Sequence, residues 1–186
     1  MLLCLALGFG QGLAAADEAD NEMTHTRDWR RAGELADAAI RRAEGERGYV
    51  YALDGVLHYG IGHRLTADEL KVMKHGNLVD VELVTSAYRD DFNTAFSAVI
   101  DLHIRHPAEL NAARIAVLIE MAFCHGADGL AGYTQMFNAI ERGDWDTAAR
   151  EMFDSRWYRE QGAELPAIKE RVERLANQLQ TGKVAA

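Results

Sequence analysis

The chain has 186 residues, enough for one domain with a proper core and short for two. Its composition, 48% hydrophobic and 26% charged, is that of an ordinary globular protein. The net charge of −9 argues against nucleic acid as a partner, because phosphate binding needs a basic face.

The first sixteen residues, MLLCLALGFGQGLAAA, form an apolar run that ends in small residues. This pattern is typical of a secretory signal, and the run is too short and too interrupted for a stable membrane span. Signal peptides usually begin with a positively charged region, and this run has none. The alternatives are therefore a retained, releasable anchor and a wrongly assigned initiator methionine. The acidic stretch that follows indicates a flexible connector. We therefore expect a signal or anchor over 1–16, a connector over 17–27, a catalytic domain over 28–182, and a secreted or periplasmic protein.

An amphipathic helix is predicted from about Asp28 to Ala43, with small and apolar residues along one stripe. Glu44 ends this helix, and Gly45 is a residue that commonly stops helices. A carboxyl group at such a helix end can be shielded from water. Glu44 is therefore a candidate proton donor near neutral pH.

A β-hairpin follows the helix. Residues 49–51 have strand character, Asp54-Gly55 is a strong hairpin-turn signal, and residues 56–61 form the returning strand. Alternation along that strand places His58, Gly60 and Gly62 on one face.

Helices dominate the rest of the chain. Thr66 to Glu69 forms a capping box that opens a short helix, and Pro107 stops a long helix that begins near Thr85. The segment 109–123 is the most uniformly apolar and predicts the buried centre of the core. The remaining helices are predicted over 134–141, 144–153 and 166–179.

The hairpin reads Glu44-Gly45, Tyr51, Asp54 and then HYGIGH over 58–63, which resembles the active-site hairpin of the phage lysozymes, glycoside hydrolase family 24. Three further landmarks follow in the family's order: RIAVLIEMAFCHGADGLAG over 114–132, Trp145-Asp146, and SRWY over 155–158. The resemblance covers residues 35–179. It implies a mainly helical α+β fold, in which a long helix joins a small β-hairpin lobe to a larger helical lobe and the glycan lies in the cleft between them.

The resemblance also implies a function. It predicts a muramidase that cleaves the β-1,4 bond between N-acetylmuramic acid and N-acetylglucosamine in peptidoglycan, as a bacteriolytic, endolysin-like hydrolase. Such an enzyme works as a monomer and needs neither a metal nor an organic cofactor. The alternative is a degenerate lysozyme fold that binds peptidoglycan or another protein without cleaving it, because function can detach from fold.

Glycoside hydrolysis needs an acid for the leaving oxygen and a second group on the opposite face of the sugar. Glu44 matches the family's acid. Asp54 has two interpretations, a second catalytic carboxylate or a turn residue. The hairpin is one residue shorter than the family norm, so Ala52 or Leu53 takes the position of the usual aspartate.

His58 stands where the family has a threonine that helps to hold the attacking water. An imidazole there can hold or deprotonate this water, which gives inversion, or attack the sugar carbon itself, which gives retention and transglycosylation. A packed strand histidine is the third interpretation. His63 falls on the opposite strand face, so the two histidines do not share a metal. The family pattern predicts that His63 pairs with Asp91 or Asp90.

The resemblance implies substrate contacts at Gly62, Arg64 and Phe123, although the residue type at Arg64 differs from the family's. The family also has an arginine that faces the acid, and this chain does not keep it at the matching position. Arg156 and Arg171 are the candidate replacements. Cys124 precedes His125, which suggests a thiol nucleophile with a neighbouring base. We predict instead that Cys124 is a packed helix residue, because adjacent helix residues do not face each other.

Overall fold

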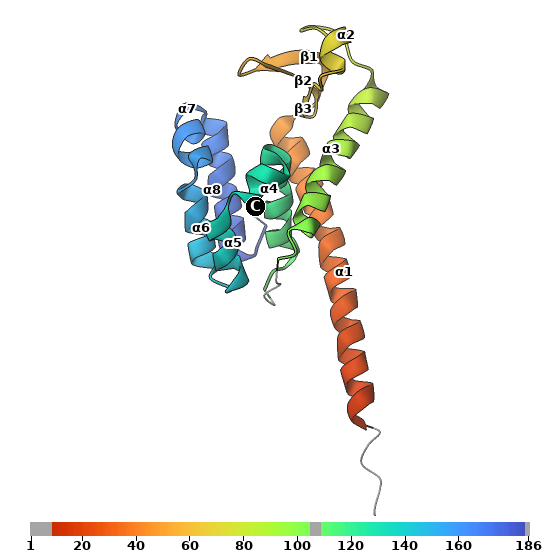
Figure 1. Ribbon diagram of the computed structural model, residues 1–186, viewed down its shortest axis with the longest axis vertical. Coiled ribbons are helices and arrows are strands. Elements are labelled where there is room, and N and C mark those ends of the chain that lie inside the picture. The colour runs from red at the N-terminus through yellow and green to blue at the C-terminus, as the bar shows by residue number, and fades with distance from the viewer. Residues whose placement is uncertain (1–8, 105–108, 185–186) are drawn as a thin grey trace, which may run out of the picture.

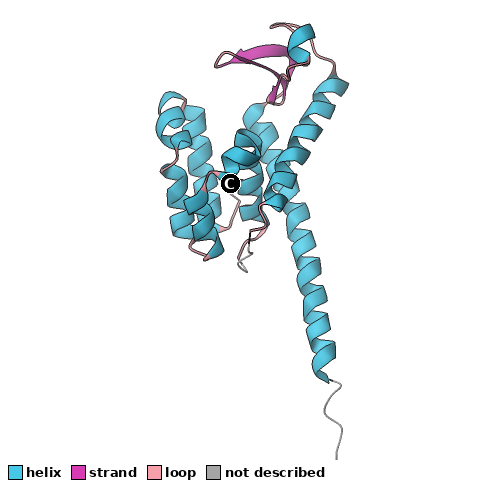
Figure 2. Ribbon diagram, viewed as in Figure 1, coloured by secondary structure: helices cyan, strands magenta, loops and turns pink. Residues whose placement is uncertain are grey.

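The computed structural model describes residues 9–104 and 109–184, with side chains from residue 26 onward. Helices make up most of the protein, and the three strands gather at one end of the molecule (Figures 1 and 2). The strands form one antiparallel sheet in the order β1-β2-β3. The predicted mainly helical α+β fold is confirmed.

The chain begins with one helix and then the three strands, namely α1 (Phe9–Glu44), β1 (Arg47–Leu53), β2 (Val56–Gly60) and β3 (His63–Arg64). The next three helices are α2 (Glu69–Val72), α3 (Val81–Asp101) and α4 (Ala112–Ala131). The C-terminal elements are α5 (Thr134–Glu141), α6 (Trp145–Phe153), the π-helical turn η1 (Trp157–Gln161), α7 (Gly162–Glu164) and α8 (Pro166–Thr181).

Helix α1 begins at Phe9, well before the predicted start at Asp28, and its first half extends away from the body of the protein (Figure 1). The flexible connector expected over 17–27 is helical in this structure. The physical reason is that this stretch contains neither glycine nor proline, so no residue in it strongly opposes the helix. Residues 1–8 lie outside the described residues, and removal of a signal stays a prediction.

Helix α3 joins two hydrophobic cores, as predicted. The small core packs the sheet against the start of α3 and contains Val50, Tyr59, Leu65, Val84 and Ala87. Further along the same helix, residues such as Ala95 and Val99 belong to the large core of the helical lobe. One helix therefore links the two lobes.

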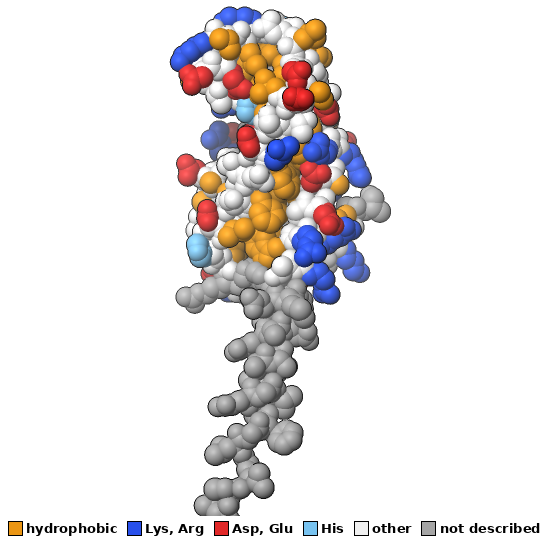
Figure 3. Space-filling model, turned by 90° about the vertical axis from the view of Figure 1, so that its right-hand side faces the viewer, with side chains coloured by type: hydrophobic (Ala, Val, Ile, Leu, Met, Phe, Trp, Pro, Cys, Tyr) orange, Lys and Arg blue, Asp and Glu red, His pale blue; other side chains and the backbone are white. Residues whose placement is uncertain are grey.

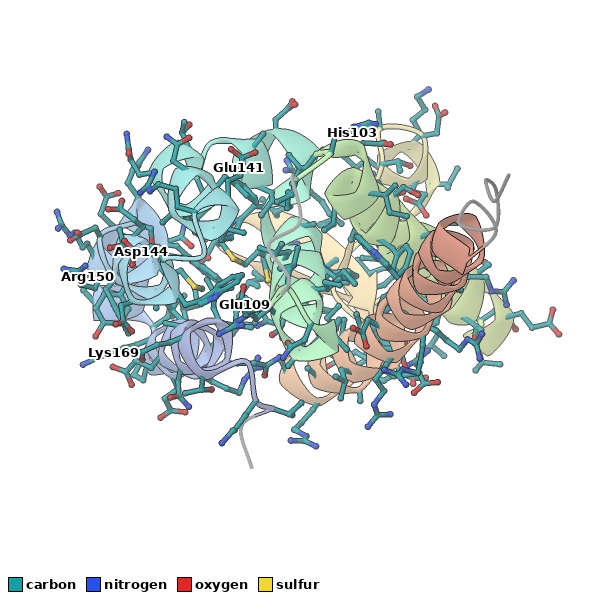
Figure 4. The ribbon with its side chains drawn as sticks, turned by 90° about the horizontal axis from the view of Figure 1, so that it is seen from below. His103, Glu109, Glu141, Asp144, Arg150 and Lys169 are labelled. Atoms are coloured by element: carbon teal, nitrogen blue, oxygen red, sulfur yellow. The ribbon has the colours of Figure 1, made fainter. Side chains whose placement is uncertain are left out.

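Helix α4 forms the centre of the helical lobe, and every residue from 113 to 122 is buried. It contacts α1, α3 and α8. Seen from below (Figure 4), α4 lies between α1 and α3 on one side and α5, α6 and α8 on the other. The helix continues to Ala131 through a break at Gly126, whose φ of 70° is not helical. The predicted buried centre is confirmed.

Part of the packing between α1 and α3 remains at the surface. Trp29 of α1 meets Phe96 of α3 edge to face, with ring centroids 5.6 Å apart, and both rings are only partly buried. The space-filling view of this side shows a stripe of apolar side chains between charged ones (Figure 3). The aromatic contact of Trp29 with Phe96 thus helps to join α1 to α3.

Among the described residues, no single helix is both long and apolar enough to cross a membrane.

Candidate active site

Glu44 is the last residue of α1, and the chain turns sharply after it. Gly45 has a φ of 65° and its amide donates to the carbonyl of Arg41, which closes the helix end. The Glu44 side chain is 23% exposed. Its position at the end of a packed helix fixes the carboxyl group next to the hairpin.

Gly62, in the turn between β2 and β3, lies directly against this carboxyl group. Its φ is 76°, and a Cβ at this position would lie 3.2 Å from Oε2 of Glu44. The left-handed backbone favours glycine, and any side chain would press on the carboxyl group. The turn of the small lobe therefore covers the end of α1 only because residue 62 has no side chain.

Arg171 of α8 holds Glu44 from the other side. Its Nη1 donates to Oε1 of Glu44 at 2.9 Å. Arg156, the other candidate replacement for the family's arginine, pairs instead with Glu160 at the surface. The structure thus decides between the two candidates in favour of Arg171.

Two residues that the sequence did not single out complete this group. Oε1 of Glu120, on α4, accepts from Nε of Arg171 at 2.8 Å and from Nη2 of Arg174 at 2.5 Å. Glu120 is 1% exposed. One signal was present in the sequence: an acid in the middle of the most apolar helix is buried, and a buried charge needs a partner.

His58 lies on the face of β2 opposite Tyr59, which is buried in the small core. Its register partners are Tyr51 on β1 and Arg64 on β3, and its ring stacks on that of Tyr51 with centroids 5.7 Å apart. Nδ1 lies 3.0 Å from the carbonyl oxygen of Val56. Because a carbonyl only accepts, Nδ1 carries the proton in this arrangement, and Nε2 is left as an acceptor.

The alternation predicted along β2 stops at Gly60. This residue has a φ of 61°, and a Cβ on it would lie 2.9 Å from Cγ1 of Val84 in α3. Gly60 therefore faces α3 and does not share a face with His58. That prediction was wrong at Gly60 because regular alternation needs extended backbone at every residue.

Asp54 lies at the tip of the hairpin. Strand β1 ends at Leu53 and β2 begins at Val56, so Asp54 and Gly55 form a two-residue turn with positive φ at both positions. Such a turn matches the twist of the strands. Asp54 is exposed there, and the structure shows the turn residue of the two interpretations.

His63 lies on the face opposite His58, where it pairs in register with Tyr59. Its Nδ1 lies 2.7 Å from Asp91, so the predicted pairing is confirmed, and its Nε2 lies 3.2 Å from Glu69. Hydrogen bonds between Thr66 and Glu69 also confirm the capping box. This network ties the sheet to α3 and α2 and has a structural role.

With the acid, its arginine and the hairpin in place, comparison with known families is informative. The family model described as "Phage lysozyme" matches residues 41–174, which is most of the chain and includes both Glu44 and Arg171. The chain belongs to the phage lysozyme family. No curated protein matches it. Family membership supports a glycosidase of the lysozyme type that acts on peptidoglycan.

This phage lysozyme has a pocket of about 770 Å³ on its helical lobe. Residues from α4, α5, α6 and η1 line the pocket, among them Tyr133, Met136, Glu151, Arg156 and Trp157. Burial, and then the charge of Arg171, lower the pKa of His125 to about 4, so the imidazole that lines this pocket is neutral. The lining of the pocket therefore combines the carboxyl group of Glu151, the guanidinium of Arg156, a neutral imidazole and aromatic rings.

The other candidate residues of the phage lysozyme lie in three environments. Phe123 packs on Tyr88 of α3, with ring centroids 6.0 Å apart, and remains partly exposed. Arg64 is exposed beside His58 on the sheet. Burial raises the pKa of the Cys124 thiol to about 12, which keeps it protonated and agrees with a packing role.

Proposed function

We propose that this phage lysozyme cleaves the β-1,4 bond between N-acetylmuramic acid and N-acetylglucosamine in peptidoglycan, with Glu44 as the general acid and His58 on the opposite face of the sugar. It acts as an exported monomer. Gly62, Arg64 and Phe123 contact the glycan. Asp54 takes no part in the reaction, because it is an exposed turn residue.

The observation that supports this proposal best is the environment of Glu44. Oε1 accepts from Arg171, and Oε2 faces the turn at Gly62. Because a guanidinium only donates, Oε1 is its acceptor, and Oε2 is the oxygen available to the leaving group of the substrate. A carboxyl group that is held through one oxygen and closely covered by the Gly62 turn needs little reorganisation before it protonates a leaving group.

The tautomer of His58 supports its role as a base. With the proton on Nδ1, the lone pair of Nε2 is available to a water molecule or to a sugar carbon. Stacking on Tyr51 restricts rotation of the ring. A restrained imidazole whose Nε2 is open to water is a suitable general base.

In the proposed reaction, Glu44 gives its proton to the glycosidic oxygen as the bond from that oxygen to C1 of the muramic acid breaks. Water attacks C1 from the opposite face and gives a proton to Nε2 of His58. The products are two shorter glycans, one with a new reducing end at C1. Transfer of the proton from His58 to Glu44 through solvent restores both groups.

The test is product analysis after digestion of purified peptidoglycan. Reduction with borohydride followed by mass spectrometry should show N-acetylmuramic acid at every new reducing end. Ends that carry N-acetylglucosamine would contradict the assigned bond, and no products at all would favour a binding module.

Proton NMR of the first products decides the role of His58. The proposed water attack inverts C1 and gives the α anomer. A β anomer, together with transfer to an added sugar acceptor, would replace this step with direct attack by Nε2 and make the enzyme a transglycosylase as well.

A further inference from the structure

Arg171, which binds the proposed acid Glu44, is also bound by a second carboxylate, that of the buried Glu120. Glu120 lies within the buried stretch of α4, and its side chain is only 2% exposed. A charge at such a depth is unfavourable unless it is paired and hydrogen-bonded. Two arginines from successive turns of α8, Arg171 and Arg174, provide this pairing through one oxygen, Oε1.

The guanidinium of Arg171 connects the two carboxylates. Nε donates to Glu120 at 2.8 Å and Nη1 donates to Glu44 at 2.9 Å. Because the guanidinium is planar and rigid, fixing Nε also fixes the direction in which Nη1 points. The orientation of Arg171 toward Glu44 therefore depends on Glu120.

A third nitrogen of Arg171 shows that this orientation is imposed. Nη2 is buried and has no hydrogen-bond partner among the described residues. An unpaired buried donor is unfavourable, so an Arg171 side chain that was not held at Nε would adopt a rotamer in which Nη2 has a partner. The anchor at Glu120, on a third helix, explains why Arg171 keeps an arrangement that leaves Nη2 unpaired.

We propose that Glu120 is a positioning residue for catalysis, with Arg174 as its brace. Glu120 holds the guanidinium of Arg171 so that only Nη1 reaches Glu44, and Oε2 of Glu44 stays directed at the substrate side beside Gly62. Without the charge of Glu120, Arg171 turns to engage both oxygens of Glu44. This inference rests on the proposed role of Glu44 as the acid.

The isosteric substitution Glu120→Gln is the first test, with a soluble peptidoglycan oligosaccharide as substrate and circular dichroism as the check on folding. We expect kcat to fall about 10- to 100-fold, the range for a misplaced catalytic group, while KM stays within about twofold. KM is unaffected because Glu120 is buried and does not reach the substrate. A kcat equal to that of the wild type would overturn the proposal.

A double-mutant cycle separates positioning from a general structural effect. Arg171→Ala should lower kcat, and adding Glu120→Gln to it should lower kcat no further, because the guanidinium that Glu120 orients is gone. Additive losses would overturn the proposal.

If Glu120→Gln does not fold, Arg174→Gln replaces it, because the Arg174 side chain is 31% exposed and its loss removes only the brace. We then expect a fall in kcat of about threefold or more, and an unchanged kcat would overturn the proposal.

Failure of this inference is distinguishable from failure of the proposed function. If Glu44→Gln abolishes cleavage while Glu120→Gln does not change it, Glu44 remains the acid and only the positioning role is wrong. If the wild type and Glu44→Gln are equally inactive, the proposed function itself is wrong.

Discussion

Nη1 of Arg171 lies 2.9 Å from Oε1 of Glu44, so the last long helix of the chain holds the carboxyl group at the end of the first. The two residues are 127 positions apart in the sequence. Their pairing brings α8 to the point where α1 meets the hairpin.

Removing this ion pair should reduce activity strongly. We expect Arg171→Ala to lower the rate of peptidoglycan clearing at least about tenfold, because Glu44 loses its fixed orientation and Glu120 loses one partner. The loss of a partner for Glu120 should also lower the free energy of unfolding by about 3–5 kcal/mol. Arg156→Ala is the matched control: its side chain is 87% exposed and pairs with Glu160, so both quantities should stay near the wild type. Equal activity in the two variants would refute the assignment of Arg171.

A methyl group at position 62 should displace the acid. Gly62→Ala puts a Cβ 3.2 Å from Oε2 of Glu44, on backbone with a φ of 76°. We expect an unfolding free energy lower by about 1–2 kcal/mol from the backbone alone, together with a large loss of kcat.

The hairpin tip provides the control for Gly62. Gly55 also has a φ of 76°, but a Cβ there meets nothing within 4 Å. Gly55→Ala should therefore lower stability by a similar amount while keeping kcat. If both variants keep wild-type kcat, the contact between residue 62 and Glu44 does not matter for the reaction.

The network around His63 predicts how stability changes with pH. The hydrogen bond to Asp91 raises the pKa of His63 above 6.5, against the effect of burial. Protonated His63 therefore stabilises the fold fully below pH 6.5, and this contribution is lost as pH rises through its higher folded pKa. Partial burial opposes ionisation of Glu69, but hydrogen bonds from Thr66, Tyr59 and His63 lower its pKa to about 2, so it stays ionised throughout this range.

Urea unfolding of the wild type and of His63→Gln over this pH range provides the measurement. The difference in unfolding free energy should be greatest below pH 6.5, where it should reach about 1–3 kcal/mol, the range for hydrogen bonds to charged groups. It should become smaller in alkaline solution. A difference that does not change with pH would show that His63 contributes by packing alone.

Arg114 should matter for stability and not for catalysis. This residue is 7% exposed and donates to the carbonyl groups of Glu109, Leu179 and Gln180, and its guanidinium lies 3.7 Å from the ring centroid of Trp145. Arg114→Ala leaves these carbonyls unpaired and should lower the unfolding free energy by about 3–5 kcal/mol.

Arg150, labelled on the outer side of α6 in Figure 4, is the control for Arg114. It is exposed and makes hydrogen bonds only within its own helix, so Arg150→Ala should change stability by less than about 0.5 kcal/mol. Both variants should keep wild-type kcat under conditions in which they are folded. A stability loss of the same size in both would contradict the role of Arg114 at the end of α8.

Local patterns were sufficient to predict much of this fold. Helix α5 has the predicted bounds, α6 begins one residue after its predicted start, and Asp54-Gly55 forms the predicted turn, because each depends on residues next to each other in the chain. The pairing of His63 with Asp91 came from the family pattern. The resemblance also pointed to Glu44.

Contacts between distant segments were not predictable in the same way. Glu120 is 51 residues from Arg171, and nothing in the local sequence of α4 names its partner on α8. The prediction at Gly60 failed because a single positive φ ended the alternation. The early start of α1 was missed because an acidic composition suggested a connector, whereas helix propensity favours continuation.

The central claim is that Glu44 is the proton donor, and the rate of glycan cleavage by Glu44→Gln tests it most directly. The substitution keeps the shape of the side chain and removes its acidic proton. Glu46→Gln is the control, because this exposed acid lies two residues away in the same turn. We predict that purified peptidoglycan is cleared by the wild type and by Glu46→Gln at similar rates, and by Glu44→Gln at least about 100-fold more slowly. Clearing by Glu44→Gln at the wild-type rate would contradict the account.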